Sequence, residues 1–155
     1  MGHACLTEDA NVQQYAVKAD RLSSVLRDQV GLRREATLLD AGCGIGALIP
    51  LYVALGFEVT GVDISPTAIR EARARGVEAA LFVERLDGLQ LGRFFDVVLA
   101  VDVLQHVTED AEWLRTLASL SRHLGDGGRL IILDCTSETA SSAGHCRRRA
   151  LEDFS

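Results

Sequence analysis

The feature that most constrains this chain is a glycine-rich turn between two predicted strands. In the stretch 38–63, LLDAGCGIGALIPLYVALGFEVTGVD, glycine occupies every second position from Gly42 to Gly46. Glycine has no Cβ and tolerates positive φ, so such a turn can bend sharply and let a ligand lie against bare main chain. The stretch therefore predicts a strand, a ligand-binding turn, a crossover helix and a second strand that ends in Asp63.

Two interpretations fit this stretch. The run Gly42-x-Gly44-x-x-Ala47 satisfies the relaxed dinucleotide-binding pattern, in which a pyrophosphate lies on the helix N-terminus. Asp40 and the three glycines fill an acid-x-Gly-x-Gly-x-Gly pattern, whose extra carboxylate would repel a pyrophosphate and attract an ammonium or sulfonium group. Asp63 lies twenty-three residues after Asp40, the separation at which a βαβ unit places an acid beside ribose hydroxyls. The acid at position 40 favours the second interpretation.

Alternating apolar patterns continue along the chain. An amphipathic helix is predicted over 7–30, and Ser65-Pro66 predicts an N-cap followed by a first-turn proline. Further helices are predicted at 47–55, 67–75 and 109–124, the last with Thr108 as its cap and Leu114 on its apolar stripe, and strands at 57–62, 77–83, 95–101 and 129–134. This order predicts an α/β fold with a doubly wound, mainly parallel sheet.

Acidic residues recur at the predicted strand ends. Ligands of doubly wound sheets bind beyond the carboxyl ends of the strands. Five acids fall there, namely Asp40, Asp63, Asp87, Asp102 and Asp134. One or two such acids could be caps or turn residues, whereas five predict a site that favours a cation.

Four ordered motifs, LLDAGCGIG, VTGVDISPTAI, FFDVVLAVDVLQHV and LGDGGRLIILD, give the stretch 9–134 a resemblance to a known family. It resembles the class I S-adenosylmethionine-dependent methyltransferases, in their branch of small-molecule enzymes. The resemblance implies a Rossmann-like fold, S-adenosyl-L-methionine as cofactor and S-adenosyl-L-homocysteine as product.

The same resemblance implies a set of cofactor contacts. Asp40 and the turn 42–46 would hold the methionine part, Asp63 would bind the ribose, Ile64 would flank the adenine, and Asp87 would take the adenine amino group. The implied cofactor-binding residues are Asp40, Ala41, Gly42, Cys43, Gly44, Gly46, Asp63, Ile64, Leu86, Asp87, Val101 and Asp102.

The reaction implied is transfer of a methyl group to an oxygen, carbon or nitrogen of a small metabolite. Such an in-line displacement requires donor and acceptor to be held collinear. His106 is the candidate general base or substrate contact, because an imidazole titrates near neutral pH; a local structural role is the alternative. His145 and Asp134 are weaker candidates, and Gln14 and Tyr15 could touch substrate from the first helix.

Composition narrows the partners. The 155 residues are 48% hydrophobic with a net charge of −6, which predicts one domain over 1–155, made of an N-terminal helix (7–30), a cofactor-binding core (36–134) and a tail (135–155). The acidic balance argues against nucleic acid, and the basic run 147–149 is expected to be a solvated surface. The tetrapeptide DPPY or NPPY of amino-methylating relatives is replaced by AVDVL, so a nucleic-acid base is not expected as acceptor.

The sequence also gives expectations for cellular location and for metal binding. No apolar run is long enough to span a membrane and no signal segment is recognised, so a cytoplasmic protein is expected. The four cysteines and four histidines show no zinc-like or disulfide-like spacing, which predicts free thiols and no metal.

The end of the chain departs from the family pattern. Class I domains continue beyond the fifth strand through a helix and an antiparallel hairpin, whereas here only 135–155 remain. We expect a loop over 136–144 and at most one helix over 145–155, so that the sheet lacks its last two strands. The strand 129–134 would then present an open, flat apolar edge, at which a second copy could pair to give a homodimer.

Three hypotheses remain open at this point. The favoured one is a small-molecule methyltransferase or its cofactor-binding portion. The second is a catalytically incomplete protein that binds S-adenosylmethionine without transferring its methyl group. The third is an NAD-binding oxidoreductase, supported only by the relaxed glycine pattern.

Overall fold

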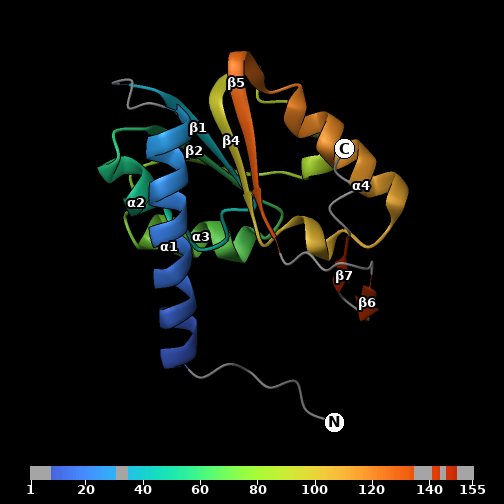
Figure 1. Cartoon of the computed structure of the whole chain (residues 1–155), viewed down its shortest axis with the longest axis horizontal. Helices are drawn as coiled ribbons and strands as arrows, with labels where there is room; N and C mark the ends of the chain where they lie inside the picture. The colour runs from blue at the N-terminus through green and yellow to red at the C-terminus, as the bar shows by residue number, and fades with distance from the viewer. Residues whose placement is uncertain (1–7, 31–34, 135–140, 144–145, 150–155) are drawn as a thin grey trace.

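A computed structural model describes residues 8–30, 35–134, 141–143 and 146–149 of the chain. Its main element is a parallel sheet of five strands in the order β3-β2-β1-β4-β5. The elements are α1 Glu8–Val30, β1 Thr37–Ala41, α2 Ile49–Ala54, β2 Glu58–Asp63, α3 Pro66–Ala74, β3 Ala80–Val83, η1 Leu86–Gly88, β4 Phe95–Val101, η2 Leu104–His106, α4 Asp110–Ser121, β5 Leu124–Leu133, β6 Ser141–Ala143 and β7 Cys146–Arg148 (Figure 1). The predicted doubly wound α/β fold is confirmed.

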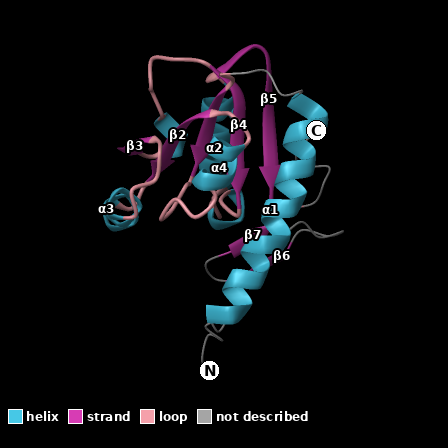
Figure 2. Ribbon diagram, turned by 90° about the vertical axis from the view of Figure 1, so that its left-hand side faces the viewer, coloured by secondary structure: helices cyan, strands magenta, loops and turns pink. Residues whose placement is uncertain are grey.

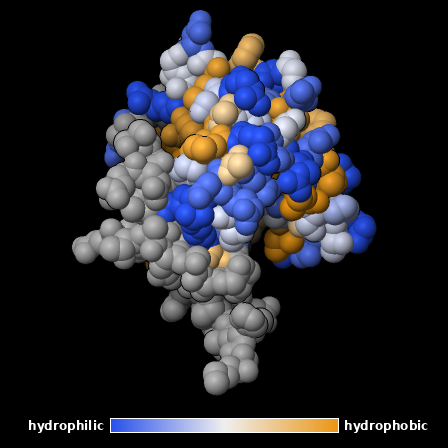
Figure 3. All heavy atoms as spheres, turned by 90° about the vertical axis from the view of Figure 1, so that its right-hand side faces the viewer, coloured by the Kyte–Doolittle hydropathy of each residue, from blue (hydrophilic) through white to orange (hydrophobic). Residues whose placement is uncertain are grey.

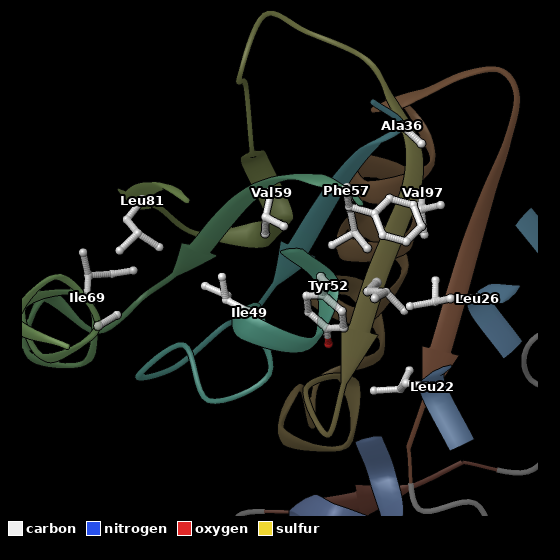
Figure 4. Packing of buried hydrophobic residues seen from close by; sticks show 13 residues of the cluster. Leu22, Leu26, Ala36, Ile49, Tyr52, Phe57, Val59, Ile69, Leu81 and Val97 are labelled. Atoms are coloured by element: carbon white, nitrogen blue, oxygen red, sulfur yellow. The ribbon is translucent and has the colours of Figure 1, made fainter. Parts of the chain in front are cut away.

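Two hydrophobic layers enclose the sheet. On one face, Leu22 and Leu26 of α1 pack with Tyr52 of α2 and Ile69 of α3 over the strands (Figure 4). On the other face, α4 and the short helices η1 and η2 cover a separate cluster that includes Trp113. Because both faces are covered, the inner strands β1, β2 and β4 have runs of consecutive buried residues rather than alternating burial.

Local signals in the sequence place several of these elements correctly. The side chain of Ser65 accepts a hydrogen bond from Ala68 N at 3.2 Å, and Pro66 opens α3. Pro50 lies in the first turn of α2, where its missing N–H costs nothing. The strand β4 has the predicted bounds, 95–101, and its central residues are buried on both faces.

The last helix differs from its prediction in cap and face. Glu109 rather than Thr108 is the N-cap residue of α4, without a side-chain cap hydrogen bond. The core face is formed by Trp113, Thr116 and Leu120, whereas Leu114 is 60% exposed. The large indole of Trp113 turns this side of the helix toward the sheet, and Leu114, one position further round, consequently points outward.

The fifth strand begins earlier than predicted, at Leu124 instead of Arg129. Phe95 pairs with Leu124 and Val97 pairs with Arg129, so β5 carries extra residues opposite two residues of β4. The glycine-rich stretch 125–128 forms this irregularity, since a Cβ at Gly128 would lie 2.9 Å from Phe95 O.

The edge formed by β5 is covered more than the sequence suggests. Ile131 and Leu133 pack against the cluster that contains Leu22 and Leu26, and Leu130 and Ile132 pack against the cluster on the other face. Figure 2 shows α1 running beside β5. The expected flat apolar surface is therefore only partly exposed, whereas the main-chain edge of β5, like that of β3 at the other end of the sheet, has no neighbouring strand among the described residues.

The described part of the tail corrects the predictions of a loop over 136–144 and of at most one helix over 145–155, because residues 141–143 and 146–148 are strands; residues 135–140, 144–145 and 150–155 lie outside the described part. Within its described part, β6 and β7 form an antiparallel hairpin, apart from the main sheet in Figure 1. Arg147 and Arg149 both pair with the carboxylate of Asp110, and the Arg149 guanidinium lies 4.3 Å from the centre of the Trp113 ring. Arg149 is only 6% exposed. Arg147 and Arg149 are thus held against α4 rather than free in solvent, and the side chain of Arg148 lies outside the described residues.

The surface around this region is mostly hydrophilic. Figure 3 shows the side of the molecule that lies to the right in Figure 1, where hydrophobic residues form small separate patches. Among the helices that the structure describes, none is long and apolar enough to cross a membrane.

Gly61 offers a test of how tightly the sheet packs behind the glycine turn. A Cβ at this position of β2 would lie 2.8 Å from Leu81 Cδ2 and 2.9 Å from Cys43 Sγ. We expect Gly61→Ala to lower the free energy of unfolding by about 1–3 kcal/mol, as overpacking does. Urea unfolding measures this value. Gly88→Ala is the control, since a Cβ at Gly88 meets no atom within 4 Å; equal stability losses in both variants would contradict the packing described here.

Candidate active site

The glycine turn after β1 is held by the main chain of β2. Gly42 N and Cys43 N both donate to Val62 O, at 2.7 and 2.9 Å. Gly42 has a φ of +83° and Gly44 a φ of +54°, a region that side chains disfavour. A Cβ at Gly42 would lie 2.4 Å from Val103 Cγ2, whereas one at Gly44 would meet nothing within 4 Å. The turn is therefore packed on one side and open on the other.

Asp63, at the end of β2, is bound to the glycine turn. Its Oδ2 accepts a hydrogen bond from Gly44 N at 2.9 Å, and its Oδ1 accepts one from Ser65 N at 2.8 Å. Each carboxylate oxygen can accept more than one hydrogen bond, so both still have capacity for a ligand hydroxyl. Asp63 thus joins the glycine turn, the end of β2 and the start of α3.

Asp40 lies beneath the turn and is only 3% exposed. Burial, and secondarily the negative charge of Asp63, raises the pKa of Asp40 from 3.8 to about 7. A buried carboxylate with a raised pKa is stabilised in its charged form when a cation approaches. The same surroundings act on Cys43: burial first, then Asp40 and Asp63, raises the pKa of the Cys43 thiol to about 12.

Two adjoining cavities meet at this turn. The larger, of about 320 Å³, is lined by Gly42, Asp63, Ile64, Arg85, Leu86, Asp87, Asp102, Val103, His106, Val107, Glu112 and Thr116. The smaller, of about 270 Å³, is lined by Asp40, Gly42, Cys43, Gly44, Ile45, Ala47, Leu48, Val101, Asp102 and His106. Gly42, Asp102 and His106 line both. The larger cavity has mostly apolar walls and the smaller one is more polar, so the pair suits a ligand with a flat apolar part and a charged part.

Most residues predicted for the site line one of these cavities. Among the described candidates the exceptions are Ala41, Gly46 and Asp134, which line neither. Ala41 is fully buried in the sheet. A Cβ at Gly46 would lie 3.2 Å from both Ile49 and Val77, so this glycine permits close packing of the turn against the helices. The side chains of Gln14 and Tyr15, and all of His145, lie outside the described residues.

Asp87 lies in η1, in an ion-pair network that the sequence did not predict. Arg85 Nε donates to Asp87 Oδ1 at 3.1 Å, and Arg115 lies 3.7 Å from the same carboxylate. The hydrogen bond from Arg85 is the main cause of the lowered pKa of Asp87. Arg85 also donates to Glu112 at 2.8 Å, which connects η1 to α4. These partners lie up to 28 residues apart, and no local pattern indicates them.

Asp102 follows β4 in a left-handed conformation, with a φ of +55°. Its main-chain N donates to Leu133 O at 2.8 Å, and its carboxylate accepts a hydrogen bond from Lys18 of α1. Lys18 is a site-neighbouring residue that sequence reasoning missed, because 84 residues separate the two partners. The ion pair brings α1 to the place where the two cavities meet. We call this place, which is marked by Asp102 and His106, the rim.

His106 is exposed at the end of η2, and its Nδ1 lies 3.4 Å from Cys146 Sγ of β7. Asp134 is close by: its Oδ2 accepts a hydrogen bond from Gln105 N at 3.0 Å. Burial is the main cause that raises the pKa of Asp134 to about 6; the hydrogen bond from Gln105 N opposes the rise, Asp102 adds to it and His106 opposes it. The rim thus brings together an imidazole, a thiol and two carboxylates.

Comparison with known proteins identifies the family. A sequence model of the methyltransferase domain matches residues 12–153, so the chain belongs to the methyltransferase domain family. It is similar to the ubiquinone biosynthesis O-methyltransferase of Methylobacterium sp. (strain 4-46), with 40% identity over 91 residues, covering 56% of this chain and 36% of that protein. The enzyme of the same name from Caulobacter sp. (strain K31) is 40% identical over 102 residues, covering 61% and 39%.

Solved structures agree with this assignment. Magnesium protoporphyrin IX methyltransferase from Synechocystis PCC 6803, with bound SAM, superposes with a TM-score of 0.74 and 25% identity, covering 99% of this chain and 71% of that one. A sugar N-methyltransferase from Streptoalloteichus sp. ATCC 53650 gives a TM-score of 0.71 and 26% identity, covering 94% and 60%. The match to the Methylobacterium relative takes in about a third of that protein's length.

The raised pKa of Asp40 predicts how stability depends on pH. In the unfolded chain this carboxyl has its ordinary pKa of 3.8, whereas in the folded chain its pKa is about 7. The folded state therefore binds the extra proton between these values, and stability present below about pH 4 is lost as the pH rises through about 7. We expect Asp40→Asn to exceed the wild type in free energy of unfolding at about pH 8, by up to about 4 kcal/mol, and the difference to shrink toward about pH 4.

Urea unfolding at a series of pH values measures this difference. Asp126→Asn is the control, because Asp126 is exposed and the variant loses the same formal charge. A difference between Asp40→Asn and wild type that is independent of pH would contradict the raised pKa.

Proposed function

We propose that this chain is the cofactor-binding part of an S-adenosylmethionine-dependent methyltransferase that acts on a small molecule. The observation that carries the proposal is the buried Asp40 carboxylate beneath an open glycine turn, where two cavities meet. Membership of the methyltransferase domain family supports it, as does the likeness to a methyltransferase that holds SAM.

The shapes and charges of the cavities fit this cofactor. In the larger cavity, Asp63 would accept hydrogen bonds from the ribose, while Ile64 and Leu86 would flank the adenine and Asp87 would face its amino group. In the smaller cavity, the charges of Asp40 and Asp102 would attract the ammonium and sulfonium groups, with Cys43, Gly44 and Val101 as the wall. A side chain at position 44 would enter the space that the open side of the turn provides.

Bound S-adenosylmethionine would supply a methyl group for displacement from its sulfonium. The chain's own contribution would be to orient the donor, with Val103 packed closely against the Gly42 main chain at the turn. His106, on the rim of both cavities, is the residue that could take a proton from the acceptor, with Asp134 close enough to stabilise the imidazolium. The names of the curated relatives favour an oxygen acceptor; carbon and nitrogen remain within the proposal.

Two other functions can be separated from this one. A protein that binds the cofactor without methyl transfer is the first alternative; the chain spans 34–49% of the length of the curated relatives that it matches. An NAD-binding oxidoreductase is disfavoured, because the buried Asp40 carboxylate would face the pyrophosphate.

The expected partners and location belong to the same proposal. A small-molecule acceptor rather than nucleic acid fits the negative net charge of −6. The unpaired main-chain edge of β5, within the described residues, supports pairing with a second copy of the chain. Fractionation of cells that produce the full-length protein tests the cytoplasmic location.

Calorimetric titration tests the cofactor. We expect saturable binding of S-adenosylmethionine and S-adenosylhomocysteine but not of NAD. Asp40→Asn should weaken binding of both by about tenfold or more, because the variant loses the charge that faces their cationic groups. The wild type should bind more tightly at about pH 8 than at about pH 6, since Asp40 ionises around pH 7.

Asp20→Asn, on the exposed surface of α1, is the matched control and should bind like the wild type. Binding of NAD alone, or unchanged affinity of Asp40→Asn for S-adenosylmethionine, would count against the proposed function.

A further inference from the structure

The tail of the chain brings a thiol to the rim of the site. Cys146, in β7, places its Sγ 3.4 Å from Nδ1 of His106, although 40 residues separate the two in sequence. His106 is exposed and lines both cavities, and Cys146 is half-buried. A thiol in contact with an imidazole that reaches solvent is the arrangement in which a cysteine becomes nucleophilic.

Two arginines that follow Cys146 fix the contact between Cys146 and His106. Arg147 Nη1 donates to Thr108 O at 3.1 Å and Arg149 Nη2 donates to Val107 O at 3.3 Å. These carbonyls belong to the two residues that follow His106, so the hairpin is fixed directly to the segment that carries the imidazole. The ion pair of Arg149 with Asp110, at 2.6 Å, adds a third attachment. The hairpin that carries the thiol and the segment that carries the imidazole are therefore bound to each other, which keeps Cys146 and His106 in contact.

We propose that Cys146 is a redox-modifiable thiol, activated by His106, through which hydrogen peroxide controls access to the site. His106 Nδ1 takes the thiol proton, and the thiolate attacks one oxygen of the peroxide. An S–O bond forms and the O–O bond breaks; the departing hydroxide takes the proton from the imidazolium and leaves as water. Sulfur is oxidised to a sulfenic acid and the peroxide is reduced.

The chain contains its own comparison thiol. Cys43 lies in the same site, yet burial and the carboxylates of Asp40 and Asp63 raise the pKa of its thiol to about 12. Its Sγ contacts Gly44 O rather than a base. Cys146 and Cys43 should therefore differ sharply in reactivity within one molecule.

Modification would reach the ligand through His106. An oxidised sulfur carries added oxygen at the point where Cys146 touches the imidazole, on the rim that both cavities share. This consequence rests on the proposed function, whereas the reactivity of the thiol does not.

Iodoacetamide labelling, read for each cysteine by peptide mass spectrometry, tests the reactivity. The thiolate sulfur attacks the methylene carbon, a C–S bond forms and iodide leaves. In the folded chain at about pH 7 we expect Cys146 to react about tenfold or more faster than Cys43, and His106→Asn to slow Cys146 by about tenfold. In concentrated urea, where no contact persists, both thiols should react alike in wild type and variant.

The control is His145→Asn, which removes the imidazole next to Cys146 in the sequence and should leave its labelling rate unchanged. Equal rates for Cys146 in wild type and in folded His106→Asn, or faster labelling of Cys43, would overturn the proposal. Circular dichroism verifies that the variants are folded.

Peroxide treatment completes the test. Dimedone, which captures sulfenic acids, should label Cys146 after exposure to hydrogen peroxide, and Cys146→Ser should lose this label. The treated wild type should bind S-adenosylhomocysteine more weakly than the treated Cys146→Ser chain. Dimedone labelling without a change in binding would overturn control of access, and absence of labelling at Cys146 would overturn its peroxide sensitivity. A chain that labels as expected but never binds S-adenosylhomocysteine contradicts the proposed function instead.

Discussion

The whole site depends on how the glycine turn is tied to the second strand. One carbonyl, Val62 O, accepts two main-chain N–H groups of the turn, and the next residue, Asp63, accepts a third from Gly44. These bonds fix the turn before any ligand arrives, so its open side is already shaped. Because Gly42 leaves room for Val103, the segment after β4 also closes directly onto the turn. The ends of three neighbouring strands are thereby held in one rigid arrangement.

The electrostatics of the site follow from that arrangement. Bringing strand ends together also brings their acids together, and burial prevents water from screening them. Two of these acids respond by raised pKa values, Asp40 to about 7 and Asp134 to about 6. Asp102 is instead paired with Lys18, which comes from the N-terminal helix. Such a site has a cost in stability that a cationic ligand offsets, which gives the fold a built-in preference for positive charge.

Sequence patterns predicted the parts of the fold that depend on local physics. Burial on both faces defined β4, and the Ser65-Pro66 pair defined the start of α3. The predictions failed where distant contacts decide the structure. The chain around Cys146 is extended because Arg149 is drawn onto Trp113 and Asp110, and nothing near residue 146 in the sequence reveals that attraction. The partners Lys18 and Arg85 escaped notice for the same reason, since an isolated basic residue on a helix or loop normally indicates only solvated surface.

Local and distant contacts also contribute differently to the two parts of the site. The part of the site proposed to hold the cofactor is built mainly from segments between β1 and η1, with Val101 and Asp102 added from the end of β4. The rim around His106 is different, because its neighbours arrive from α1, from the end of β5 and from the hairpin. A change in the tail can therefore alter the surroundings of the imidazole while the glycine turn stays intact. Acceptor choice and thiol chemistry would then vary together, since both depend on the hairpin's attachment to the residues after His106.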